Sequence, residues 1–108
     1  MLDTKTRSIV KYYIPEGETL DDMSNLFSAF ADQTRLKILS ALSICEMCVG
    51  DLAEVISVNQ TTVSHQLKYL KTQNLVNAKR IGKIVFYSIS GELVPELMSI
   101  GVSGLGYV

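Results

Sequence analysis

The stretch that decides the fold is residues 59–70, which read NQTTVSHQLKYL. Within it Val63, Leu67 and Leu70 recur at i, i+4 and i+7, the spacing of a narrow apolar stripe along an α-helix. Asn59 is a favourable N-cap residue, because its side-chain oxygen can accept a hydrogen bond from a free backbone N–H group of the first turn. The pattern therefore predicts a helix that starts after Asn59 and buries one side.

The other side of this helix carries hydroxyls, amides and one imidazole, and it lacks acidic residues. When the N-terminal end of a helix enters the major groove of DNA, glutamine can pair with adenine, and serine or threonine with several bases. Two lysines follow nearer the helix end, where phosphates would lie. The residues predicted to contact DNA are Gln60, Thr61, Thr62, Ser64, His65, Gln66, Lys68 and Lys71. The alternative is an ordinary solvated helix face.

The segments on both sides of this helix predict a helix-turn-helix followed by a wing. Residues 50–56 fit a short helix, and residues 57–59 fit a tight turn between the two helices. Further on, two β-rich runs, residues 75–81 and 84–89, flank a Gly-Lys pair and predict a hairpin. We expect the cations of the hairpin tip to contact the DNA backbone or minor groove; they are Lys79, Arg80 and Lys83. The alternative is an edge hairpin protected by charge.

The rest of the chain predicts further helices around this unit. Apolar residues recur at helical spacing from Leu20 to Phe30, after Thr19 as a candidate N-cap, and a second helix follows Asp32 as its N-cap. A last helix starts near Leu93. The predicted organisation is an N-terminal arm (1–18), a winged helix-turn-helix domain (19–90) and a C-terminal helix (91–108).

The charge distribution favours a polyanionic partner for one part of the chain. The formal net charge of the 108 residues is only −1. Residues 1–54 hold five cations and nine acids, whereas residues 55–91 hold five cations and no acid. A polyanion would therefore be repelled by most of the chain and attracted to the segment that contains the predicted helix and hairpin.

Other classes of protein are disfavoured by the sequence. It has no apolar run long enough to span a bilayer and no apolar core of a signal peptide, so we expect a cytoplasmic protein with reduced cysteines and no membrane partner. It has no glycine-rich phosphate loop and no recognisable pair of nucleophile and base, so we expect no enzyme activity. The remaining alternative is a winged helix that binds protein and not DNA, although such a module has no reason to exclude acids over 37 residues.

Three segments resemble the ArsR/SmtB family of bacterial repressors. They are FADQTRLKIL (30–39), EMCVGDLA (46–53) and the stretch 59–70, which is followed by a basic wing. The resemblance implies a mainly α winged helix-turn-helix with a β-hairpin wing, in the order α-α-α-α-β-β-α, dimerising through its terminal helices. It also implies a homodimer that binds double-stranded operator DNA, represses a nearby operon, and is released by an inducer.

The last predicted helix carries an apolar surface suited to the dimer that the resemblance implies. The candidate interface residues are Leu93, Leu97, Met98 and Ile100. The alternative is that these side chains only complete the core of one subunit.

The metal sites of the family are only partly represented in this sequence. One family site uses Asp and His ligands in the last helix, but residues 90–108 contain no Asp, His or Cys, which excludes a zinc-type site there. A second family site uses a Cys-Val-Cys motif; here Cys48 matches its first cysteine, and Gly50 stands at the place of the second. Cys45 is a candidate to compensate, although two thiolates are fewer than the four ligands usual in a tight site.

Three interpretations of Cys45 and Cys48 remain open. Cys48 is simply buried, as a small apolar residue. The pair is a redox switch, with a thiolate exposed near a helix N-terminus. The pair binds a soft metal or metalloid, such as arsenite, cadmium or zinc, with ligands from solvent or another chain. No cofactor follows with certainty from the sequence.

Overall fold

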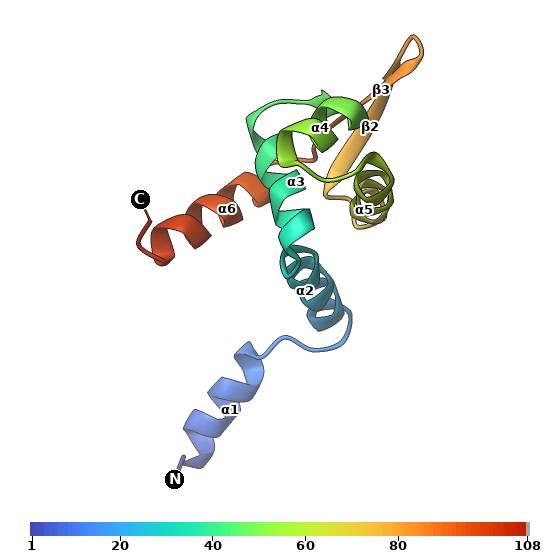
Figure 1. Ribbon diagram of the computed structural model, residues 1–108. Helices are drawn as coiled ribbons and strands as arrows, with labels where there is room; N and C mark the ends of the chain where they lie inside the picture. The colour runs from blue at the N-terminus through green and yellow to red at the C-terminus, as the bar shows by residue number, and fades with distance from the viewer. Residues whose placement is uncertain (108) are drawn as a thin grey trace.

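The computed structural model describes residues 1–107, and within them the chain forms six helices and three strands (Figure 1). Their bounds are α1 (Thr4–Tyr13), α2 (Gly17–Phe30), α3 (Gln33–Ile44), β1 (Met47–Cys48), α4 (Val49–Ile56), α5 (Gln60–Thr72), β2 (Val76–Ile81), β3 (Ile84–Ile89) and α6 (Leu93–Gly104). The predicted winged helix-turn-helix with a β-hairpin is confirmed. The order departs from α-α-α-α-β-β-α in two places: α1 precedes the predicted elements, and β1 lies between α3 and α4.

The core is built around α3. Asp32 caps this helix, its carboxylate accepting the backbone N–H of Arg35 at 2.9 Å, and the helix buries Ile38 and Leu39 completely. On its different sides α3 contacts α2, α4, α5, β3 and α6. The helix also buries Ala41 and Leu42, and the other buried side chains come from α2, α4, α5, the α5–β2 connection, β2 and α6: Ala29, Leu52, Ala53, Ile56, Val63, Leu67, Leu70, Leu75, Val76 and Val94. One apolar core therefore supports both α5 and the start of α6.

The three strands form an antiparallel sheet in the order β1-β3-β2. Its two-residue edge strand pairs Met47 with Tyr87 and Cys48 with Phe86. In the hairpin, β2 pairs with β3 from Val76↔Ile89 to Ile81↔Ile84. The turn between them begins at Gly82, whose φ of +64° is a conformation that glycine adopts without steric cost. The hairpin extends beyond the helices as a wing (Figure 1).

The N-terminal helix α1 stands apart from the rest of the chain (Figure 1). The Asp3 carboxylate caps it by accepting the Thr6 N–H at 2.7 Å, and this bond lowers the pKa of Asp3. All of its residues are exposed. The radius of gyration is 17.7 Å, whereas a compact domain of 100 residues has about 13 Å. The predicted arm is thus largely helical, and its apolar side chains have no cover within the described chain.

The predicted N-cap at Thr19 is wrong. The helix α2 begins at Gly17, and Glu16 occupies the N-cap position without a side-chain hydrogen bond. Gly17 has a φ of +61° and leads directly from the extended Glu16 into the helix, so Thr19 already lies in the first turn. No helix in the described part of the chain is long and apolar enough to cross a membrane.

Candidate nucleic-acid interface

A tight turn sets the direction of α5 relative to α4. Ser57 adopts a left-handed conformation (φ 59°, ψ 45°) and donates its N–H back to the carbonyls of Ala53 and Glu54. Asn59 then caps α5, with its Oδ1 atom 2.8 Å from the Thr62 backbone nitrogen. The turn of residues 57–59 and the cap are as the sequence predicts. They satisfy free backbone groups at the junction, so the two helices are joined without a flexible linker.

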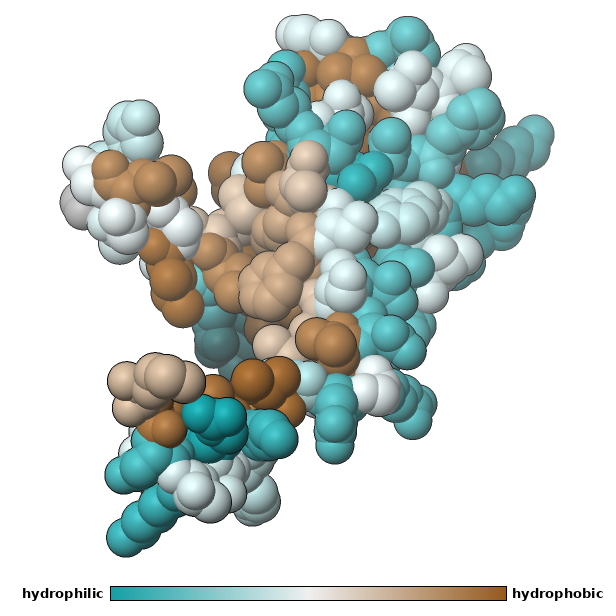
Figure 2. Space-filling view, turned by 90° about the horizontal axis from the view of Figure 1, so that it is seen from below, coloured by the Kyte–Doolittle hydropathy of each residue, from teal (hydrophilic) through white to brown (hydrophobic). Residues whose placement is uncertain are grey.

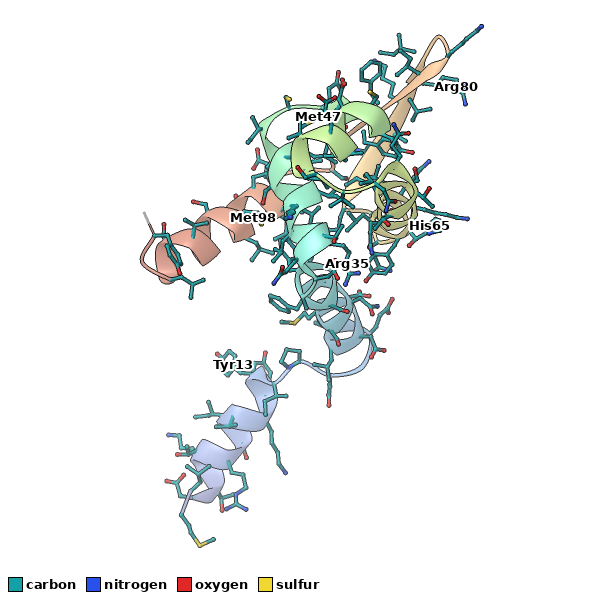
Figure 3. All side chains as sticks on the ribbon, in the orientation of Figure 1. Tyr13, Arg35, Met47, His65, Arg80 and Met98 are labelled. Atoms are coloured by element: carbon teal, nitrogen blue, oxygen red, sulfur yellow. The ribbon has the colours of Figure 1, made fainter. Side chains whose placement is uncertain are left out.

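The two sides of α5 differ as the sequence predicts. Val63, Leu67 and Leu70 are completely buried. Most of the predicted contact residues on this helix lie on its outer side, where they are exposed: Gln60, Thr61, Ser64, His65, Lys68 and Lys71. Thr62 and Gln66 are half-buried. Figure 3 places His65 and Arg80 on the side of the molecule away from α6. This helix therefore offers donors and acceptors to solvent while its apolar stripe is fixed in the core.

Arg35 is a positioning residue that the sequence analysis did not identify. Its guanidinium donates to the carbonyl oxygens of Ala29 (3.0 Å) and Ser28 (2.9 Å) at the end of α2. It also donates to Gln66 Oε1 at 3.3 Å and lies 4.8 Å from the centre of the Tyr69 ring. One side chain on α3 thus joins the end of α2 to the middle of α5.

The contact with Arg35 changes what Gln66 can do. Its amide oxygen accepts a hydrogen bond from protein, and the side chain is half-buried. Pairing of glutamine with adenine uses both the amide oxygen and the amide nitrogen. Of the predicted contact residues, Gln66 is therefore the one whose side chain is already engaged inside the protein.

Gln60 lies beside the first turn of α4. A Cβ atom built at Gly50 would be 3.5 Å from Gln60 Nε2, an ordinary van der Waals contact. The start of α4 therefore lies close to the start of α5, the end predicted to face bases, and the two helices pack against each other.

The cations of the wing are accessible to solvent. Lys79, Arg80 and Lys83 are exposed, and Lys83 belongs to the turn between the strands. Because side chains alternate along a strand, Lys79 and Arg80 lie on opposite faces of the hairpin. The hairpin follows α5 after three residues and packs against it. The structure thus brings the two predicted groups of contact residues onto neighbouring elements.

The two cysteines lie at opposite ends of a short connection. Cys45 is the C-cap residue that follows α3 and is exposed, whereas Cys48 is half-buried at the N-cap position of α4. Both are free thiols. Cys48 is half-buried and not fully buried, so the interpretation of Cys48 as a simply buried apolar residue agrees only in part with the structure. Within residues 1–107 no three His, Cys, Asp or Glu side chains are grouped closely enough to hold a metal ion.

An apolar surface covers the side of the molecule away from α5. Figure 2 shows apolar side chains gathered over α2 and along the neighbouring parts of α1 and α6. Leu93 and Ile100 of the predicted dimer residues are exposed by 48% and 67%, whereas Leu97 and Met98 are half-buried. Met98 packs against the core, in line with the second interpretation, whereas Leu93 and Ile100 are exposed and remain candidates for an interface.

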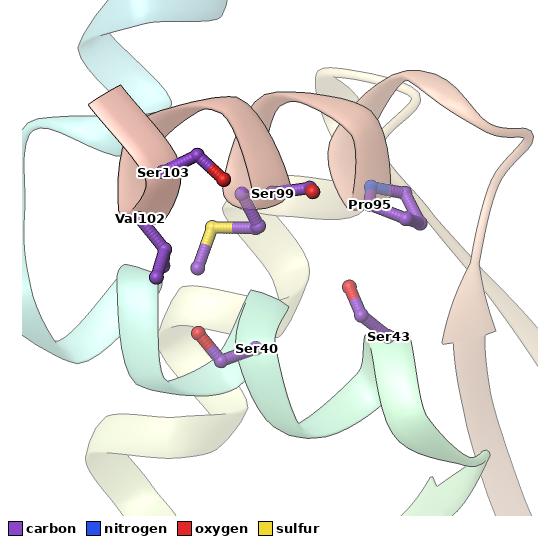
Figure 4. Close-up of a pocket in the computed structure, with 7 residues that line it drawn as sticks. Ser40, Ser43, Pro95, Ser99, Val102 and Ser103 are labelled. Atoms are coloured by element: carbon purple, nitrogen blue, oxygen red, sulfur yellow. The ribbon is translucent and has the colours of Figure 1, made fainter. Parts of the chain in front are cut away.

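A groove of about 370 Å³ lies between α3 and α6 (Figure 4). It is lined by Ser40 and Ser43 from α3 and by Pro95, Met98, Ser99, Val102 and Ser103 from α6. The two α3 hydroxyls donate within their own helix, to the carbonyls of Leu36 and Leu39 at 2.7 Å. This groove therefore presents an apolar floor with few free donors.

A capped helix with a polar, acid-free outer face, followed by a basic hairpin, defines a winged helix-turn-helix DNA-binding protein. Comparison with known proteins agrees with this class. The family model described as "Bacterial regulatory protein, arsR family" matches residues 32–78. The chain is 43% identical to the transcriptional repressor SmtB homolog of Synechocystis over 91 residues, which cover 82% of this chain and 69% of that protein.

Two further similar proteins extend the comparison. A cadmium resistance transcriptional regulatory protein, a CadC homolog of Staphylococcus aureus, is 38% identical over 71% of this chain and 64% of its own length. The homodimeric winged helix-turn-helix DNA-binding domain of Mb0332 from Mycobacterium bovis superimposes with a TM-score of 0.73, at 27% identity, over 99% of this chain and 94% of that one. The chain belongs to the arsR family of bacterial regulatory proteins, and it is a DNA-binding transcriptional repressor and not an enzyme.

Proposed function

We propose that the chain acts in the cytoplasm as a homodimer that binds double-stranded operator DNA and is released from it by an effector. In this proposal residues 19–90 form the DNA-binding domain, and residues 91–108 belong to the dimer interface. The observation that carries the proposal is the outer face of α5, which is exposed, polar and free of acids, next to a wing with three exposed cations.

We assign base contacts to the first turns of α5. Gln60, Thr61, Ser64 and His65 are exposed there, and this end of a helix-turn-helix enters the major groove. Thr62 lies at their edge and is a weaker candidate. Because its oxygen is held by Arg35, Gln66 is expected to contribute through its amide nitrogen alone.

Phosphate contacts come from the end of α5 and from the wing. Lys68 and Lys71 lie in the later turns of the helix, and Lys79, Arg80 and Lys83 lie on the hairpin. Each cation that neutralises a phosphate releases a counterion, which makes binding depend steeply on salt. These residues are thus expected to set affinity for all DNA, while those at the start of α5 set sequence preference.

A homodimer is supported by the exposed apolar surface. Leu93, Leu97 and Ile100 on α6 continue the uncovered apolar side chains of α2, and such a patch is unusual for a monomer. A twofold protein also matches a twofold operator, because each subunit then meets one half-site.

The effector is proposed to act at Cys45 and Cys48. Cys45 lies two residues before β1 and is exposed, and Cys48 is the last residue of β1, directly before α4. Soft thiolate ligands suit cadmium, zinc and arsenite, and an oxidant could instead link the two sulfur atoms. The cadmium-resistance regulator among the similar proteins favours a soft metal.

Titration of duplexes from the DNA upstream of the gene tests this function, with binding read by fluorescence anisotropy at several salt concentrations. The Ser64→Ala/His65→Ala variant should lose preference for the operator over a shuffled duplex. The Lys79→Ala variant should bind all duplexes more weakly, with a slope of log affinity against log salt lower by about one unit. A parent protein that binds no duplex would favour a protein-binding module, and variants that bind like the parent would refute the assignment of α5.

A further inference from the structure

The wing ends in two exposed isoleucines. Ile81 closes β2, Ile84 opens β3, and the two are partners in the strand register. Paired β-branched side chains stabilise a hairpin. Even so, 52% of Ile81 and 51% of Ile84 remain exposed. They lie next to the turn at Gly82, at the end of the hairpin that projects farthest from the helices (Figure 1). Pairing alone therefore leaves an uncovered apolar surface at the tip.

Cations surround this surface. Strand alternation puts Lys79 on the same face of the hairpin as Ile81, and Arg80 on the opposite face. Lys83 lies in the turn between the two isoleucines, and residues 55–91 contain no acid. A neutral apolar protein surface could cover the isoleucine pair, but it would leave the cations on both faces unpaired. Charge complementarity instead points to a polyanion with an apolar component.

We propose that Ile81 and Ile84 contact the floor and the sugar walls of the DNA minor groove beside the major-groove segment occupied by α5. This inference rests on the proposed function and adds a second mode of recognition to it. The tip is continuous with the proposed DNA-binding face, because β2 starts shortly after α5 ends and packs against it. Lys79 and Lys83 then lie where the phosphates border the groove, and the isoleucines lie between them.

The apolar pair gives this contact a preference among bases. An A·T pair shows only acceptors in the minor groove, whereas a G·C pair adds the guanine amino group as a donor. Covering that amino group with an isoleucine removes its water without replacing the hydrogen bond, which is unfavourable. We therefore expect the segment under the wing to favour A·T pairs. This part of the affinity should not depend on salt, because it releases no counterions.

The test uses a duplex obtained by selecting tight binders from a random-sequence pool with the full chain. The Ile81→Thr/Ile84→Thr variant keeps β-branched side chains, so the hairpin is retained, and it should bind that duplex about tenfold more weakly. Its slope of log affinity against log salt should equal that of the parent, in contrast to Lys83→Ala. Ile44→Thr is the matched control, because Ile44 is 84% exposed at the end of α3, outside the wing, and its replacement should change nothing.

Modified bases show whether the isoleucines contact the minor groove itself. Replacing A·T by G·C under the wing should weaken binding of the parent about fivefold or more. Replacing guanosine there by inosine, which lacks the minor-groove amino group, should restore binding of the parent. The threonine variant should respond to neither change. Equal affinities of parent and threonine variant, or a lower salt slope in that variant, would overturn the inference while leaving the proposed function intact. If the parent selects no duplex, the proposed function fails and the inference fails with it.

Discussion

Replacement of Arg35 by alanine should destabilise the protein without removing any residue of the DNA-facing surface. The substitution deletes the hydrogen bonds to Ala29 and Ser28, the bond to Gln66 Oε1, and the contact with the Tyr69 ring. For a half-exposed guanidinium each of the three bonds is worth about 0.5–1 kcal/mol. The cation–π contact adds about 0.5–1 kcal/mol. The expected loss in the free energy of unfolding is therefore about 2–4 kcal/mol.

Urea denaturation at fixed protein concentration measures this loss, since the stability of a dimer depends on concentration. With a slope of about 2 kcal/mol per molar urea, the midpoint should fall by about 1–2 M. Arg35→Lys is the matched control: it keeps the charge but not the planar fork, so it should recover only part of the loss.

A double-mutant cycle locates the effect on α5. Combining Arg35→Ala with Tyr69→Leu should show a coupling of about 0.5–1 kcal/mol. Additive single effects would show that the ring contact contributes nothing. A midpoint for Arg35→Ala equal to that of the parent would refute the role of this side chain as the link between α2, α3 and α5.

Two further predictions concern assembly and effector. Leu97→Glu should place a charge in the proposed dimer surface and give a monomer that binds operator weakly; sedimentation of the parent as a monomer at micromolar concentration would rule the interface out. Cys45→Ser and Cys48→Ser should still fold and bind DNA, but cadmium or arsenite should release only the parent, as followed by fluorescence anisotropy; release of parent and double variant at the same dose would remove the cysteines from the mechanism.

The helix-turn-helix could be predicted because its signals are local. The Asn59 cap, the buried stripe of Val63, Leu67 and Leu70, and the turn before them all lie within residues 57–70, where helical periodicity and capping chemistry decide the conformation. The hairpin was predictable for the same reason, since Gly82 supplies the positive φ that its turn needs.

Contacts between distant segments could not be predicted in this way. Arg35 and Gln66 are 31 residues apart, and their hydrogen bond depends on how α3 crosses α5. The strand β1 has only two residues, which are too few to show an alternating apolar pattern in the sequence. It forms because Met47 and Cys48 pair with β3. The prediction at Thr19 is wrong because the capping pattern is also met inside a first turn, and the conformation at Gly17 decides where the helix begins.

The position of Gly50 gives the proposed effector response a short physical route. Cys48 occupies the N-cap position of α4, and Gly50 in the first turn of that helix adjoins Gln60 in the first turn of α5. Drawing Cys48 toward Cys45 would therefore displace the backbone next to the end of α5 that is proposed to meet bases. An effector shifts the equilibrium only by its differential affinity for the free and DNA-bound forms. Gly50→Leu tests the route: a Cβ there already lies 3.5 Å from Gln60 Nε2, so the larger side chain would have to displace Gln60, and operator affinity should change in the absence of any effector. Gly50→Ala is the matched control, because its methyl group makes only an ordinary van der Waals contact and should leave operator affinity nearly unchanged.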